Sequence, residues 1–218
     1  MDIRTSDQPI LELGYGGHRC NWGVHIAGLY ETPEERDEII LGFLCQGFSA
    51  GDLQLFPTPT GHGKQLHDRL RHRCGACAER LDDERYFAPR TVETLYYPNG
   101  TFSPAAMDEG LEAFWQTSQQ DGQRNIRATA DMSWALEAIP GVEGLMAYEA
   151  NLNRFISDKP WVSICLYDLS RFKGRTVMEV LRTHPWTLSA GALVENPYYE
   201  DPDDWLRRQE KEAPRRPQ

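Results

Sequence analysis

The sequence predicts an α/β fold with a mostly parallel central sheet flanked by helices, and three observations lead to this prediction. Segments with strand character alternate along the chain with segments of helical periodicity. Residues 161–167 are apolar at nearly every position, as expected of a parallel strand that is buried on both faces. Hydrophobic residues make up 40% of the 218 residues, which suffices for a sizeable core.

The N-terminal part of the chain predicts short strands followed by a helix. Residues 1–30 place polar and apolar side chains around glycines, which is typical of short strands and loops. A helix is expected to follow Thr32, with Pro33 in its first turn and a capping box completed by Glu35. Gly47 is expected to end this helix.

The rest of the chain continues the alternation of strands and helices. Apolar, β-branched or aromatic segments predict strands at 52–56, 91–97, 125–130, 161–167, 186–190 and 192–195. Helical periodicity and capping signals predict helices at 64–80, 104–115, 142–155 and 174–182.

The composition excludes several classes of protein. A formal net charge of −10 argues against nucleic acid or an anionic membrane as the main partner. There is no apolar run of about eighteen residues, and residues 1–8 lack the apolar core of a signal peptide. Five cysteines, an odd number in a chain of this size, favour a reducing cytosol. We therefore expect a cytoplasmic protein with one domain at 1–206 and a polar, disordered tail at 207–218.

The densest group of potential ligand residues lies between positions 17 and 30. His18 and Cys20 are two residues apart, so they point to one face of an extended segment, and a turn through Gly23 could bring His25 to them. Imidazole and thiolate suit zinc, copper or iron, including haem iron. The sequence therefore predicts a metal or haem site at His18, Cys20 and His25. The alternative is that these side chains only pack and hydrogen-bond.

A weaker metal candidate consists of His72, Cys74 and Cys77. The two cysteines form a single CxxC, which is half of a zinc site or a redox pair, and they share one face of the predicted helix. No second CxxC is present. We therefore favour the alternative, two small side chains on a partly exposed helix.

Residues 58–65 form a degenerate phosphate-binding loop between a predicted strand and a predicted helix. Gly63 and Lys64 match the end of the phosphate-loop motif. Thr58 stands where the motif has Gly, Gln65 replaces the hydroxyl that would hold magnesium, and Pro59 removes a backbone donor. We therefore expect no nucleotide hydrolysis.

Side chains at predicted strand ends suggest a ligand pocket, because ligands in α/β sheets bind beyond the carboxyl ends of strands. The candidates are Asp131, Met132 and Trp134 after one predicted strand, taken together with Arg182 and His184; Trp22 and Tyr30, which lie in the stretch around His18, Cys20 and His25, are further ligand-binding candidates. The alternative is that Met132 and Trp134 belong to the core and that Arg182 forms a structural ion pair with Glu179 or Glu195. Cys165 lies in the middle of a strand and is interpreted as an inert core thiol.

Five separated blocks of sequence resemble the MEDS domain, the sensory domain named after methanogens, methylotrophs and the dichloromethane regulator. They contain the sequences Gly-His-Arg-Cys, Leu-Tyr-Glu-Thr-Pro-Glu-Glu-Arg, Met-Ser-Trp-Ala-Leu, Leu-Arg-Thr-His-Pro and Glu-Asn-Pro-Tyr-Tyr, at 17–20, 29–36, 132–136, 181–185 and 195–199. The resemblance covers most of residues 15–206. It departs from the common family form in the added residues 21–25, which contribute His25.

The resemblance implies a three-layer, RecA-like or circadian-clock-ATPase-like fold that has lost nucleotide chemistry. It also implies a role in signal transduction, with simple hydrocarbon derivatives as ligands. We expect a sensor that binds a small apolar or metal-held ligand near residues 18–30 and signals to a separate protein, and we allow for a homodimer. Two alternatives stay open: a metal- or haem-dependent enzyme that uses His18, Cys20 and His25, and an interaction scaffold without a ligand.

Overall fold

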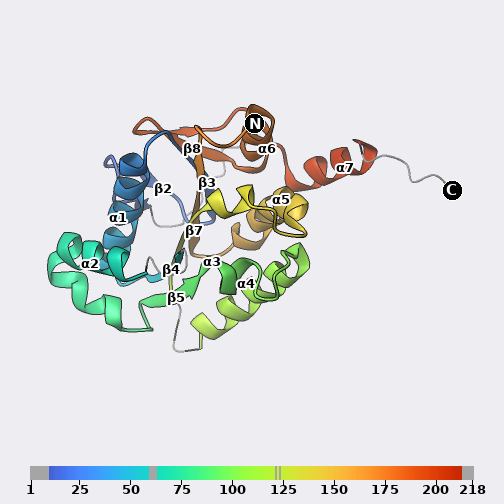
Figure 1. Ribbon diagram of the computed structural model, residues 1–218. Coiled ribbons are helices and arrows are strands. Elements are labelled where there is room, and N and C mark those ends of the chain that lie inside the picture. Colours follow the sequence, from blue (N-terminus) through green and yellow to red (C-terminus); the bar gives the residue numbers. More distant parts are fainter. Residues whose placement is uncertain (1–9, 59–62, 121, 123, 213–218) are drawn as a thin grey trace.

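A seven-stranded sheet forms the centre of the molecule in the computed structural model, which describes residues 10–58, 63–120, 122 and 124–212 (Figure 1). In spatial order the strands are β5 (Phe87–Thr91), β4 (Leu53–Thr58), β6 (Ile126–Asp131), β7 (Trp161–Asp168), β3 (Val24–Tyr30), β8 (Trp186–Ser189) and β9 (Ala192–Glu195). All neighbours pair in parallel except β8 and β9. The predicted fold class, α/β with a mostly parallel sheet, is confirmed.

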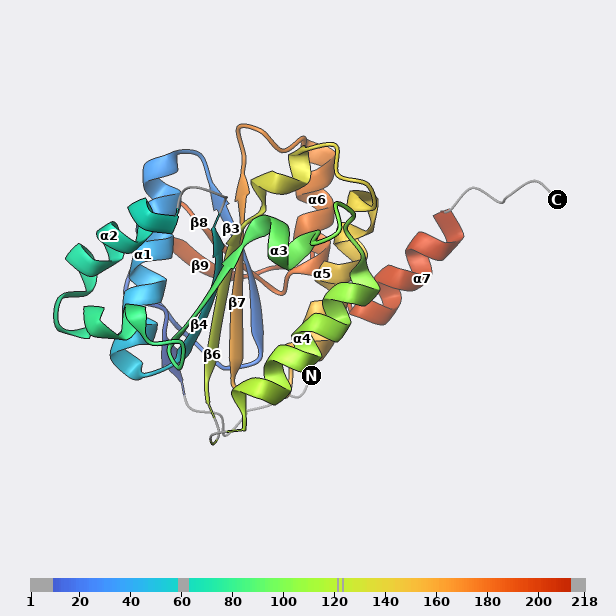
Figure 2. The same cartoon turned by 60° about the horizontal axis from the view of Figure 1, so that its bottom comes forward.

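Helices cover both faces of this sheet, giving three layers (Figure 2). One face carries α1 (Pro33–Ala50), α2 (Gly63–Cys74) and the 3₁₀ helix η1 (Gly75–Asp82). The other face carries α3 (Val92–Tyr96), α4 (Pro104–Ser118), α5 (Leu145–Ile156) and α6 (Gly174–Thr183), with the 3₁₀ helices η2 (Met132–Leu136) and η3 (Val142–Gly144). The last helix, α7 (Pro202–Glu212), contacts α5 and α6.

The two faces of the sheet bury separate apolar clusters, because side chains of a strand alternate between its faces. Ile26 of β3 packs with Phe43 of α1 on one side. Ala27, its neighbour in sequence, packs with Leu152 of α5 on the other. Strand β3 is seven residues long and lies between β7 and β8, so the expectation of only short strands and loops in residues 1–30 was wrong. The short strands β1 (Leu11–Glu12) and β2 (Arg19–Cys20) form a separate antiparallel pair.

Helix α1 passes through Gly47, where the sequence predicted its end, and stops at Gly51 instead. Gly51 adopts a left-handed conformation with φ 83°, the usual role of a glycine that ends a helix. Gly47 serves packing: a Cβ atom there would lie 2.0 Å from Nε2 of Gln54 and 2.6 Å from Cδ of Arg127. Helix and strand therefore approach closely at Gly47.

Within residues 91–97, where the sequence predicted a strand, Val92–Tyr96 form helix α3. Thr91 and Thr94 make a reciprocal capping box, which outweighs the β-branched composition of this segment. The strand lies just before it, as β5 at the edge of the sheet, where its Pro89 is tolerated because an edge strand leaves one set of backbone groups unpaired.

The predicted tail is helical up to Glu212. Trp205 and Arg208 of α7 donate hydrogen bonds of 3.0 and 3.1 Å to Glu179 of α6, so residues 207–212 are part of a docked helix. Residues 213–218 lie outside the described part of the chain. Within the described part, no helix has the length and apolar character needed to span a membrane.

Candidate functional site

The structure does not bring His18, Cys20 and His25 together. The His18 ring lies in a loop, with Nε2 2.6 Å from the carbonyl oxygen of Gly191. Cys20 is buried in the cluster on the α1 side, and this burial raises the pKa of its thiol to about 12. His25 points to the opposite face of the sheet, because it alternates with Ile26 along β3. The predicted metal or haem set is therefore not assembled by the described residues.

The second predicted set is also not formed. Cys74 is joined in a disulfide to Cys45 of α1, so it has no free thiolate to offer a metal. Its neighbour in the CxxC, Cys77, is half-buried and directs its Sγ to the carbonyl oxygen of Cys74 at 3.0 Å. His72 is exposed on α2. The odd number of cysteines had suggested a reducing environment, whereas the structure contains this disulfide.

Two of the predicted pocket residues, Tyr30 and Asp131, do meet at the carboxyl ends of β3 and β6. The Tyr30 hydroxyl lies 3.3 Å from both carboxylate oxygens of Asp131 and 3.3 Å from Oγ of Ser133. Arg36 of α1 donates to Asp131 at 3.1 Å. Burial, and next the Asp131 charge, raise the pKa of Tyr30 to about 12. These side chains satisfy one another in a partly exposed network.

The connection from β3 to α1 is poorly suited to phosphate. The helix N-terminus, where an anion would bind, is capped by Thr32, which accepts a hydrogen bond from the Glu35 backbone. The Glu35 carboxylate in turn accepts a bond from the backbone N–H of Glu31 at 3.0 Å. Acidic side chains thus occupy the place of the anion. Of the loop predicted to be a degenerate phosphate loop, Thr58, Gly63, Lys64 and Gln65 are described, and 59–62 lie outside the described residues.

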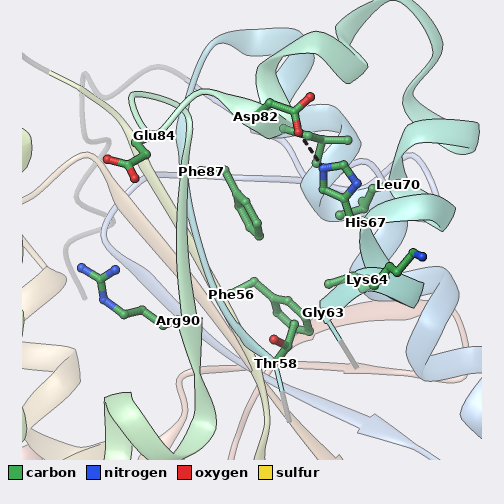
Figure 3. A pocket seen from close by; sticks show the side chains of 12 residues that line it. Phe56, Thr58, Gly63, Lys64, His67, Leu70, Asp82, Glu84, Phe87 and Arg90 are labelled. Carbon is green, nitrogen blue, oxygen red and sulfur yellow. Dashed lines mark hydrogen bonds and ion pairs between the residues drawn. The ribbon is translucent and has the colours of Figure 1, made fainter. Parts of the chain in front are cut away.

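A hollow of about 420 Å³ lies beside these strand ends, between β4, β5, α2 and η1. Its apolar lining includes Phe56 and Phe87, whose rings point into it, together with Leu66, Leu70 and Leu81 (Figure 3). Polar side chains also line it, and on the α2 side Nε2 of His67 lies 2.9 Å from Asp82. This volume is in the usual range for small-molecule sites, and the lining combines apolar side chains with polar and charged ones.

The remaining predicted pocket residues serve packing or ion pairs. Met132 and Trp134 are buried on the α5 side, where the indole stacks on Tyr96 with ring centroids 4.5 Å apart. Trp22 is buried on the α1 side. Arg182 pairs with Glu179 at 2.6 Å and Glu200 at 3.2 Å, near α7. These contacts agree with the alternative interpretation, in which Met132 and Trp134 belong to the core and Arg182 forms a structural ion pair.

His25 and His184 meet in a buried polar cluster that the sequence did not reveal, formed with Glu149 of α5 and Cys165 of β7. Among the described residues, these four make the one group of His, Cys, Asp or Glu with ligand atoms placed to hold a metal, all within 4.8 Å of one another. Nε2 of His25 lies 3.2 Å from Oε2 of Glu149 and 3.3 Å from Sγ of Cys165. The two imidazole rings have centroids 3.9 Å apart. We call these four residues the buried quartet.

Burial disfavours the charged form of every member of the quartet. It lowers the pKa of His25 to about 3, against a smaller opposing effect of Asn153. It also lowers the pKa of His184 to about 3, helped by the neighbouring His25. Burial raises the pKa of Glu149 and, to a greater extent, that of Cys165. Four ionisable side chains are thus held in a core where none is readily charged on its own.

Little in the sequence indicated the quartet, because its members are far apart along the chain. Positions 25, 149, 165 and 184 come from two strands, a helix and the residue after a helix. A polar residue within an otherwise apolar buried segment was the available signal: Cys165 and Ser163 interrupt β7, and Glu149 lies on the buried face of α5. The interpretation of Cys165 as an isolated core thiol missed its three polar neighbours.

Residues 24–185 match the family model described as "MEDS: MEthanogen/methylotroph, DcmR Sensory domain". A curated relative, the transcriptional repressor DcmR of Methylorubrum extorquens, is 25% identical over 162 residues. That alignment covers 73% of this chain and 57% of the repressor, so the chain spans little more than half the length of this relative. The quartet lies inside the matched range, whereas His18, Cys20 and Trp22 precede it.

Two solved structures from Pyrococcus horikoshii share the fold. The KaiC-like protein PH0186 superposes with a TM-score of 0.58 at 11% identity, covering 84% of this chain and 80% of that one. The uncharacterised protein PH0321, solved with an unknown peptide, gives a TM-score of 0.56 at 16% identity and 78% coverage of both chains. The expected RecA-like, circadian-clock-ATPase-like architecture is confirmed.

Proposed function

The chain belongs to the MEDS family, and we propose that it is a sensory domain that binds a small, mainly apolar ligand in the hollow beside β4. The observation that carries this proposal is the hollow itself, whose phenylalanine and leucine lining extends from the amino end of β5 to Thr58 at the carboxyl end of β4. Ligands of doubly wound sheets bind at this edge. Tyr30 and Asp131 belong to the adjoining network and would fix the neighbouring strand ends.

The chemistry of the lining restricts the ligand. Apolar side chains favour a hydrocarbon portion, and the polar and charged side chains that also line the hollow, among them Asp82 and Glu84, would contact a single polar group. A nucleotide fits poorly, because the helix N-terminus after β3 is capped by its own side chains. We therefore propose short hydrocarbon derivatives as the ligand class.

The signal is proposed to pass to a separate regulatory protein. The curated relative is named a transcriptional repressor, which supports a link to gene regulation. The net charge of −10 disfavours direct DNA binding by this chain itself. The purified protein alone is thus expected not to retard duplex DNA in a gel at physiological salt, and specific retardation would contradict this part of the proposal.

Ligand binding can be tested by thermal shift with short-chain alcohols, amines, carboxylates and halogenated alkanes as probes. A compound that binds the folded state raises the melting temperature in a concentration-dependent way. Leu66→Trp should fill the hollow and abolish the shift. Val194→Trp, which adds the same side chain at a half-exposed position of β9, is the matched control and should preserve it.

The outcomes separate clearly. A shift that the wild type and Val194→Trp share, and that Leu66→Trp lacks, supports the hollow as the binding site. If no probe shifts the wild type, or if Leu66→Trp responds as the wild type does, the proposal is wrong.

A further inference from the structure

We infer that the buried quartet of His25, Glu149, Cys165 and His184 binds a zinc ion in tetrahedral geometry. This inference goes beyond ligand sensing and does not depend on the hollow. The quartet lies on the opposite face of the sheet, among side chains that contact α5.

The spacing of the four ligand atoms matches the edges of a zinc tetrahedron. Zinc bonds of about 2.0–2.3 Å to nitrogen, oxygen and sulfur require ligand atoms roughly 3.3–3.6 Å apart. Oε2 of Glu149 lies 3.2 Å from Nε2 of His25, 3.6 Å from Nε2 of His184 and 3.6 Å from Sγ of Cys165. The His25 nitrogen is 3.3 Å from the sulfur. Three of the six edges therefore lie within this range, a fourth is 0.1 Å shorter, and all six are within 4.8 Å.

A hydrogen bond from its ring turns a lone pair of His184 toward the centre of the quartet, whereas Nδ1 of His25 is buried without a partner. Nδ1 of His184 lies 2.7 Å from the carbonyl oxygen of Val180, and a carbonyl only accepts, so this nitrogen carries the proton. In a neutral imidazole Nε2 then has a lone pair, and this atom has no hydrogen-bond partner although it is fully buried. Such a carbonyl partner is the usual companion of a metal-binding histidine.

Glu149 is oriented in the same way. The Tyr167 hydroxyl donates to Oε1 at 2.8 Å, which leaves Oε2 to face both imidazoles and the thiol. A lone pair on Nε2 of His184 facing a carboxylate oxygen is repulsive unless a proton or a cation lies between them. Tyr167 is therefore a positioning residue for Glu149.

Charge favours a divalent ion. One thiolate, one carboxylate and two neutral imidazoles balance a dication, so the complete site has no net charge, which a buried site requires. The mixture of nitrogen, sulfur and oxygen ligands suits zinc, and four protein ligands make the closed coordination of a structural site. Because all four side chains are at most 6% exposed, the ion would enter as the chain folds.

Metal analysis of untagged protein, produced in zinc-supplemented medium and purified without chelators, tests the inference. We expect near-stoichiometric zinc, lost in Cys165→Ser and His184→Gln. Cys20→Ser and His18→Gln remove potential ligands outside the quartet and should retain the metal. The inference is overturned if the wild type contains no zinc, or if its zinc content depends on Cys20 or His18. Shared protons would then be what connects the four side chains of the quartet.

A second measurement covers variants that fail to fold. The wild type is unfolded, stripped of metal and refolded with cobalt, which reports tetrahedral thiolate coordination through its visible and near-ultraviolet absorption. We expect both the ligand-field and the thiolate charge-transfer bands, and refolded protein without them contradicts the site.

Tyr167→Phe, which keeps all four ligands, should lower zinc affinity about 10–100-fold in a chelator competition, as loss of such partners typically does. An unchanged affinity would show that Tyr167 does not position the site.

Discussion

Two polar clusters share strand β3: Tyr30, Asp131 and Arg36 at the strand ends, and the buried quartet under α5. They differ in how their polar atoms are satisfied. The strand-end side chains donate and accept hydrogen bonds among themselves and are partly exposed. The quartet points four potential ligand atoms at one another, and Nε2 of His184 lacks any partner. An open, self-satisfied network can border a site for an exchangeable ligand. A buried cluster whose ligand atoms point toward one another, such as the quartet, is better suited to a permanently bound ion.

The largest effect should follow the loss of one charge in the quartet. Glu149→Gln keeps the shape of the side chain but removes the charge needed to balance a dication. When free zinc is present at about a thousand times the dissociation constant, its binding contributes ~4 kcal/mol to the free energy of unfolding. This contribution should disappear in Glu149→Gln. Urea unfolding of zinc-loaded protein measures it, and Asp131→Asn is the matched control in the strand-end network. Equal losses in the two variants would remove the distinction between the clusters.

Reduction of the disulfide should affect the side of the sheet that carries α1 and α2, and leave the buried quartet unchanged. The Cys45–Cys74 bond joins α1 to the end of α2, which borders the hollow, and closes a separation of 29 residues. Reduction, or Cys45→Ser, should cost about 3 kcal/mol in the free energy of unfolding and weaken the thermal response to hollow-binding probes. Zinc content should not change. A loss of zinc on reduction with a non-chelating phosphine would show that the two sides are coupled.

Tyr30→Phe should have a smaller effect. It removes the hydroxyl that contacts Asp131 and Ser133 but keeps the buried ring. We expect a loss of about 1 kcal/mol in the free energy of unfolding, the usual value for one hydrogen bond, with unchanged zinc content. Denaturant unfolding and metal analysis of the same preparation check both statements. Release of zinc by this variant would contradict the independence of the two clusters.

The docking of α7 should depend weakly on pH. Burial alone would raise the pKa of Glu179, but hydrogen bonds from Arg208, Trp205 and Arg182 lower it overall. A depressed carboxyl pKa stabilises the fold above the usual value of about 4.5, and this stabilisation is lost as pH falls through the folded-state pKa. The Trp205 fluorescence, isolated by difference against Trp205→Phe, should therefore change below pH ~4.5 and not in Glu179→Gln. An unchanged signal in the wild type would show that Glu179 does not hold α7.

The sequence predicted the parts of this protein that depend on local patterns. The apolar run at 161–167 identified the central strand β7, and Pro33 with its capping threonine located the start of α1. Local signals failed where tertiary contacts decide: Gly47 resembles a helix end, but it makes room for Gln54 and Arg127. The central strand β3 was missed because His25 and Gly28 dilute its apolar pattern, although both positions are buried.

The candidate sites show the same limit. Short spacing along the chain suggested His18, Cys20 and His25, but alternation along β3 sends His25 to the other face of the sheet. Its actual partners come from α5, β7 and the end of α6, which only the order of strands in the sheet brings together. Asp131 was recoverable because it ends a predicted strand, and ligands bind beyond the carboxyl ends of such strands; Tyr30, its partner, ends the strand β3 that the sequence did not predict.

Zinc K-edge X-ray absorption of the purified, untagged protein tests the central claim most directly, because it reports the atoms bound to the metal. The buried quartet predicts one sulfur ligand and three nitrogen or oxygen ligands, two of them with the multiple scattering of imidazole. Cys165→Ser should eliminate the sulfur contribution. A first shell with no sulfur, or with several sulfurs, would contradict the assignment of zinc to His25, Glu149, Cys165 and His184.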